Sequence, residues 1–96
     1  MTMENLLFIT VATIENFTPY LSACRVLKLS YSENSPSEIA DLVYAKMVEE
    51  IPCLEDNWAP YLEIHVSGTA SDSELSSICS SLQKKDVRDR WCVNQY

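Results

Sequence analysis

The chain has 96 residues, of which 47% are apolar and 22% charged, and its formal net charge is −7. This length fits one domain over residues 1–96, and the apolar fraction excludes a disordered chain. The negative charge disfavours direct binding to nucleic acid, whose phosphates require lysine and arginine. We therefore expect a folded domain that binds no nucleic acid directly.

The amino terminus lacks the features of a secretory signal. Residues 1–5 contain an acid and no base, and the apolar run 6–9 is shorter than a signal requires. No stretch approaches the ~20 apolar residues of a membrane span. The sequence therefore predicts a cytoplasmic protein that does not contact the membrane.

The four cysteines are expected to be free thiols in a reducing compartment. Cys24, Cys53, Cys79 and Cys92 include no Cys-x-x-Cys pair, and the one histidine, His65, cannot complete a zinc site with two histidines. The single glycine is too few for a phosphate-binding loop. We expect neither a metal nor a cofactor.

The first two predicted elements are strands. Residues 6–14 are rich in β-branched and aromatic side chains, which indicates a buried strand. Residues 25–32 predict a second strand, and one helical turn is expected in the connector at residues 19–24. The two strands resemble a hairpin without a tight-turn signal.

A helix is predicted to begin after Ser35, because Pro36 suits the first helical position and Glu38 is placed to complete a capping box. Pro52 is expected to end it, since the residue before a proline is disfavoured in helical conformation. The apolar positions at helical spacing are Ile39, Leu42, Val43, Met47 and Ile51.

Residues 53–60 read as a loop and residues 61–67 as a half-buried strand with strict alternation. Ser71 and Glu74 repeat the capping pattern, so a second helix is expected to follow and to fade near Lys85. The strand's two faces are Leu62, Ile64 and Val66 against Tyr61, Glu63 and His65, and the apolar stripe of the helix is Leu75, Ile78, Cys79 and Leu82.

Residues 87–93 alternate in a way that favours a last strand at the sheet edge, with a continuation of the helix as the alternative. The element order is then ββαβαβ. This order predicts an α+β two-layer sandwich, in which a mixed four-stranded sheet carries two helices on one face. The polar side chains at alternate strand positions agree with a second sheet face open to water.

The charge is confined to one segment. Residues 33–63 contain eight acids and one base, which accounts for the whole net charge, while the rest of the chain has six of each. Aromatic side chains lie among these acids, and rings beside carboxylates suit the binding of a basic protein. The predicted partner-binding residues are Asp41, Tyr44, Glu49, Glu50, Glu55, Asp56, Trp58, Tyr61 and Glu63. The alternative is a solvated acidic surface that aids solubility.

In size, charge and expected architecture, though not in any motif, the chain resembles the small immunity proteins with which bacteria neutralise basic nuclease toxins of the colicin or contact-dependent inhibition type. The resemblance implies a non-enzymatic inhibitor, a monomer that joins the toxin in a heterodimeric complex. Its acidic residues would cover the toxin's active or nucleic-acid-binding cleft. A phage-encoded inhibitor of a host nucleic-acid-binding complex, of the anti-CRISPR type, fits the same features.

A thiol or hydrolytic enzyme is the alternative from another class. Glu63 could orient the imidazole of His65, and a cysteine could act as nucleophile, but nothing in the sequence brings a cysteine to them. We therefore expect no enzymatic activity. The bases in residues 84–90 alternate with acids and are interpreted as a solvated helix end.

Overall fold

The computed structural model describes residues 5–13, 24–51, 54 and 61–95. Residues 19–23 of the helical turn predicted at 19–24 and most of the 53–60 loop lie outside this part of the chain, while Cys24 belongs to a strand. The elements in order are β1 (Asn5–Thr13), β2 (Cys24–Tyr31), α1 (Pro36–Glu50), β3 (Leu62–Gly68), α2 (Asp72–Gln83) and β4 (Trp91–Gln95). The predicted ββαβαβ order is confirmed.

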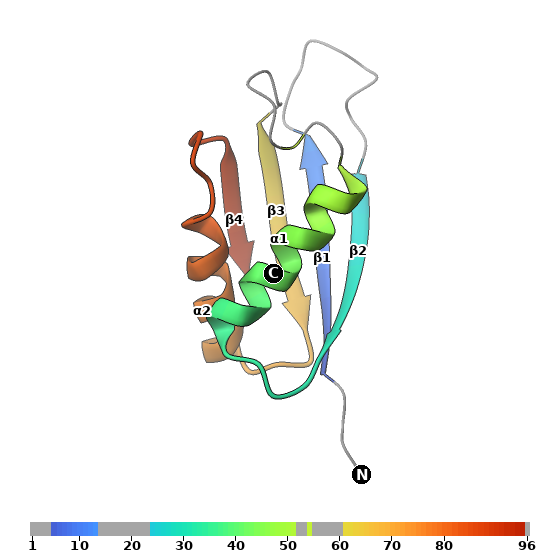
Figure 1. Ribbon diagram of the computed structural model, residues 1–96, viewed down its shortest axis with the longest axis vertical. Helices are drawn as coiled ribbons and strands as arrows, with labels where there is room; N and C mark the ends of the chain where they lie inside the picture. Colours follow the sequence, from blue (N-terminus) through green and yellow to red (C-terminus); the bar gives the residue numbers. More distant parts are fainter. Residues whose placement is uncertain (1–4, 14–23, 52–53, 55–60, 96) are drawn as a thin grey trace.

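The four strands form one mixed sheet in the order β2-β1-β3-β4. β1 pairs antiparallel with β2 and with β3, and β3 pairs parallel with β4. Both helices cross the same face of the sheet, as Figure 1 shows. The predicted two-layer sandwich with a mixed four-stranded sheet is therefore confirmed.

The core lies between this sheet face and the two helices. On the sheet, alternate residues of the central strands are buried, because successive side chains of a strand point to opposite faces. α1 contributes Ile39, Ala40, Val43 and Met47, and α2 contributes Leu75, Ile78, Cys79 and Leu82. The buried residues of the central strands are Leu7, Ile9, Val11, Leu62, Ile64 and Val66.

The start of α1 follows from its sequence. The Ser35 side chain accepts a hydrogen bond from the Glu38 backbone N–H, and Glu38 Oε1 accepts one from the Ser35 backbone N–H at 2.9 Å. These two bonds satisfy donors that have no partner inside the helix. The last helical residue is Glu50, two residues before Pro52, as expected.

Leu42 is a correction to the expected core. The sequence placed Leu42 on the apolar stripe of the helix, but its side chain is 40% exposed and Ala40 is buried in its place. The buried side of α1 is therefore rotated away from Leu42. The helix directs a leucine to solvent, although a core-facing leucine would have been expected from spacing alone.

The last strand begins later than expected. Residues 87–89 turn the chain, and β4 covers Trp91–Gln95 rather than 87–93. Asp89 has a φ of 54°, which is the left-handed conformation. The alternating sequence pattern therefore begins before the strand does, in residues that turn the chain.

Candidate protein-binding site

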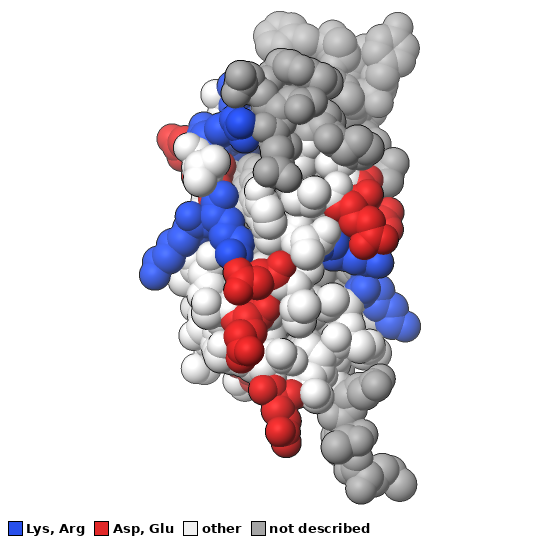
Figure 2. Space-filling model, viewed as in Figure 1, with Lys and Arg blue, Asp and Glu red and all other residues white. Residues whose placement is uncertain are grey.

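The described part of the predicted binding set comprises Asp41, Tyr44, Glu49, Glu50, Tyr61 and Glu63. Glu55, Asp56 and Trp58 lie outside the described residues. Figure 2 shows acidic residues near both ends of α1, with uncoloured surface between them and bases on both flanks of the molecule. We call the acids of α1 on the outside of the molecule, Glu38, Asp41, Glu49 and Glu50, the acidic ridge.

Three predicted acids belong to this ridge. Asp41 and Glu49 are exposed, and Glu50 is partly exposed. Lys46 Nζ lies 3.9 Å from Glu50 Oε1 one turn along the helix. Among the described residues, the Glu49 carboxylate has no hydrogen-bond or ion-pair partner. Glu49 is thus available to an external base.

Asp41 forms an ion pair with a lysine that follows α2. Lys85 Nζ contacts Asp41 Oδ1, whose side chain remains 63% exposed. The same ammonium group lies 5.8 Å from the centre of the Tyr44 ring, a cation–π distance. The bases of residues 84–90 are therefore not only a solvated helix end, because Lys85 borders the acidic ridge.

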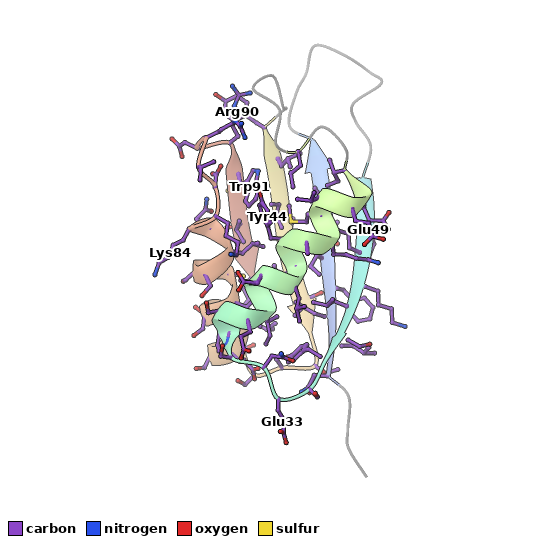
Figure 3. The ribbon with its side chains drawn as sticks, in the orientation of Figure 1. Glu33, Tyr44, Glu49, Lys84, Arg90 and Trp91 are labelled. Atoms are coloured by element: carbon purple, nitrogen blue, oxygen red, sulfur yellow. The ribbon has the colours of Figure 1, made fainter. Side chains whose placement is uncertain are left out.

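Tyr44 belongs to a small aromatic cluster. Its ring centroid lies 5.9 Å from that of Trp91, with the ring planes tilted by 40°, and Figure 3 shows the two side chains together between α1 and β4. Both rings pack against the core. Tyr44 thus connects the surface of α1 to the core. Trp91 belongs to the same aromatic cluster, although it was not among the predicted binding residues.

Tyr61 and Glu63 lie elsewhere. Tyr61 is 54% exposed, and the Arg90 guanidinium carbon lies 5.5 Å from the centre of its ring. Glu63 Oε1 is 2.8 Å from His65 Nε2. Both Glu63 and His65 alternate with the buried residues of β3, so they are on the sheet face away from the helices. Glu63 therefore does not join Asp41 and Glu49 on one surface.

The loop that carries Lys85 is held by two side chains. The Asp86 carboxylate accepts hydrogen bonds from the backbone N–H groups of Arg90 and Trp91, at 2.9 and 2.8 Å. The Gln83 amide donates to Trp91 O at 3.0 Å and accepts from the Val93 N–H at 3.0 Å. The bonds of the Asp86 carboxylate are charge-assisted, and together with those of Gln83 they fix the turn that presents Lys85 beside α1.

Two acids of α1 lie at an unfavourable end of the helix. Glu49 and Glu50 lie in the last turn, where no base is present. The partial negative charge at a helix carboxyl end favours lysine or arginine there and disfavours carboxylates. These two acids therefore weaken the helix locally.

The thiols differ in exposure. Cys79 is buried, and burial raises the pKa of its thiol. Cys92 is exposed, and its sulfur accepts a hydrogen bond from Asn94 Nδ2 at 3.3 Å. Strand register places Cys92 opposite Glu63 and Asn94 opposite His65, all on the sheet face away from the helices. This register brings a cysteine to the neighbourhood of His65, which the sequence alone did not do.

Within the described residues, no three His, Cys, Asp or Glu side chains are placed to hold a metal ion. Among the same ranges, no helix combines the length and apolar character needed to cross a membrane. Comparisons of the chain with protein-family models, curated proteins and solved structures find no match.

Proposed function

We propose that this chain is a non-enzymatic, cytoplasmic inhibitor of the immunity-protein type, which binds a basic nuclease-type bacterial toxin through α1. The observation that carries the proposal is the placement of Glu49 and Glu50 in the last turn of that helix. A lysine there would stabilise the fold. The exposed Glu49 and the partly exposed Glu50 at this position are explained by the binding of a positively charged partner.

The surrounding surface supports the same reading. From Glu33 to Glu50 the chain has five acids and Lys46 as its one base. A cluster of exposed carboxylates raises the rate at which a positively charged protein associates, and salt weakens this effect. The acidic ridge would attract the basic cleft with which a nuclease binds nucleic acid, and carboxylates would occupy the phosphate positions.

Replacement of Glu49 by lysine separates binding from stability. We expect Glu49→Lys to raise the free energy of unfolding by about 0.3–1 kcal/mol through the helix dipole, and to slow association with the toxin at low salt. Urea unfolding measures the first effect and stopped-flow mixing the second. An association rate equal to that of the wild type at low salt would contradict the proposal.

Asp72→Lys is the matched control, because it makes the same change in charge at the opposite end of a different helix. Asp72 lies in the first turn of α2 and accepts a hydrogen bond from Gln95 Nε2 at 3.2 Å. A carboxylate at a helix amino end is stabilising. The control should lose stability and keep a nearly unchanged association rate.

The partner itself can be identified by capture on the immobilised chain from lysate of the source cells. The proposal requires a captured basic protein with nuclease activity, and stoichiometric addition of the chain should abolish that activity. A captured protein whose activity persists in the complex, or a partner without excess basic charge, would refute it. Capture of a nucleic-acid-binding complex that is not a toxin would favour the phage-inhibitor alternative.

One observation favours a second candidate, a thiol enzyme: the register that places Cys92 opposite Glu63 and near His65 on one sheet face. Catalysis would require an activated thiolate. Under the main proposal, native Cys92 should instead react with iodoacetamide at about the rate of free cysteine.

Buried Cys79 is the internal reference in that experiment. Its thiol should react more slowly than Cys92, because burial restricts access and raises its pKa. Mass spectrometry of peptides after timed alkylation resolves the two sites. A Cys92 rate about tenfold above that of free cysteine, lost in His65→Ala, would support the enzyme and count against the inhibitor.

A further inference from the structure

The outer side of α1 carries an apolar patch between its acids. Glu38, Leu42, Ala45 and Glu49 follow the spacing i, i+4, i+7, i+11, which places them along one face of a helix. All four are exposed. The face therefore reads acid, leucine, alanine, acid along the helix axis, and we name these four residues the outer stripe.

The outer stripe points away from the core. The buried residues of α1, including Ile39, Val43 and Met47, lie on the opposite side of the helix. Figure 1 shows α1 in the outer layer, in front of the sheet. The exposed part of Leu42, at the centre of this face, does not contribute to the core.

We propose that the outer stripe is the docking site for an amphipathic helix of the partner, which presents apolar residues between bases. This inference rests on the proposed function and names the shape of the partner. Leu42 and Ala45 meet the apolar residues of that helix, and Glu38 and Glu49 meet its lysines or arginines. Eleven residues of helix separate the two acids by about 16 Å.

Charge complementarity and side-chain size select this occupant. Glu49, which has no partner among the described residues, offers its carboxylate at one end. At the other end, one oxygen of Glu38 is used by the helix cap and Asp41 is paired with Lys85, so attraction is weaker there. The small side chain of Ala45 allows the backbone of a second helix to approach closely.

Leu42 differs from the other exposed apolar residues because it lies between acids on the exposed face of a helix. Val87 is 85% exposed, but it lies in the turn between Lys85 and Arg88. Val26 projects from the edge strand β2, on the sheet face away from the helices. The large apolar residues that are exposed in the described ranges are Phe8, Val26, Leu42, Tyr61 and Val87. Leu42 alone among these five belongs to α1.

The probe is a synthetic helical peptide of about 20 residues, long enough to run beside α1, with leucines along one face and lysines at both ends. A peptide of the same composition in scrambled order has the same charge without the apolar face. Fluorescence anisotropy of the labelled peptides at low salt measures both affinities. The wild-type chain should bind the ordered peptide about tenfold more tightly than the scrambled one.

Leu42→Glu distinguishes the two explanations by the direction in which the affinity for the peptide changes. The substitution adds negative charge to the helix, so a purely electrostatic surface would bind the basic peptide more tightly. The proposed apolar contact instead predicts an affinity about tenfold lower. Val87→Glu makes the same change in charge outside the outer stripe and should not weaken binding.

Ala45→Gln is the second variant, in case Leu42→Glu impairs folding. It adds bulk at an exposed helical position without adding charge and should also weaken the ordered peptide. Circular dichroism and urea unfolding establish that each variant is folded. Equal affinities for the two peptides, no binding by the wild-type chain, or unchanged affinity in both variants would overturn the proposal.

Failure of this inference can be separated from failure of the proposed function. If Glu49→Lys slows association with the captured toxin while folded Leu42→Glu and Ala45→Gln bind that toxin normally, the inhibitor function stands and the docking mode is wrong. If Glu49→Lys has no effect on a captured partner, the function itself fails. Weakening of toxin binding by Leu42→Glu and by Ala45→Gln supports both.

Discussion

Ile64→Ala is expected to lower the free energy of unfolding by about 2–5 kcal/mol, whereas Leu42→Ala should cost about 1 kcal/mol or less. Ile64 is fully buried on the central strand β3, and removal of its side chain leaves a cavity that rigid neighbours fill only in part. Leu42 is 40% exposed, so its removal loses less buried area and leaves no enclosed cavity.

Urea unfolding of the two variants beside the wild type measures this difference. The dependence of the unfolding free energy on urea should stay constant, because neither substitution changes the surface exposed on unfolding by much. Equal losses for the two variants would show that Leu42 is part of the core. That result would also remove the basis for a docking role of Leu42.

Gly68→Ala is expected to lower the free energy of unfolding by about 1–3 kcal/mol or more, because the added methyl group has no space. A Cβ at this position would lie 2.3 Å from the carbonyl oxygen of Leu6 and 3.2 Å from the Cα of Leu7. Both neighbours are backbone atoms of the paired strand β1 and cannot rotate away. The variant must shift β1 relative to β3 at this end of the sheet.

Ser67→Ala is the matched control for Gly68→Ala, since it changes the preceding residue of the same strand without adding an atom to the backbone contact. Its stability should remain close to that of the wild type. Thermal unfolding followed by circular dichroism compares the two. Equal stability of Gly68→Ala and the wild type would mean that the two strands are not held at the distance described.

The helix starts could be predicted because their determinants are local. Ser35 and Ser71 accept hydrogen bonds from residues three positions later, and these patterns are visible in the sequence. The orientation of a helix about its axis is a tertiary property. Spacing alone allowed Leu42 on the buried side, but packing against the sheet selected Ala40, whose small side chain lets the helix approach.

The binding surface was predictable only in part, for the same reason. Clustering of acids in residues 33–63 is a property of the sequence, but the pairing of Asp41 with Lys85 joins residues 44 positions apart. Likewise, alternation correctly placed Glu63 on the polar face of its strand, but the charge count of residues 33–63 grouped it with the acids of the helix. Sheet topology separates Glu63 from the acids of α1.

Gln83 has a consequence for assembly. Its side-chain amide donates to Trp91 O and accepts from the Val93 N–H, which are two of the backbone groups of β4 that point away from β3. An incoming strand would need those same groups to add itself to the sheet. The glutamine side chain thus occupies two groups that a further strand would need, which disfavours edge-to-edge pairing at the start of β4 without a proline or a bulge.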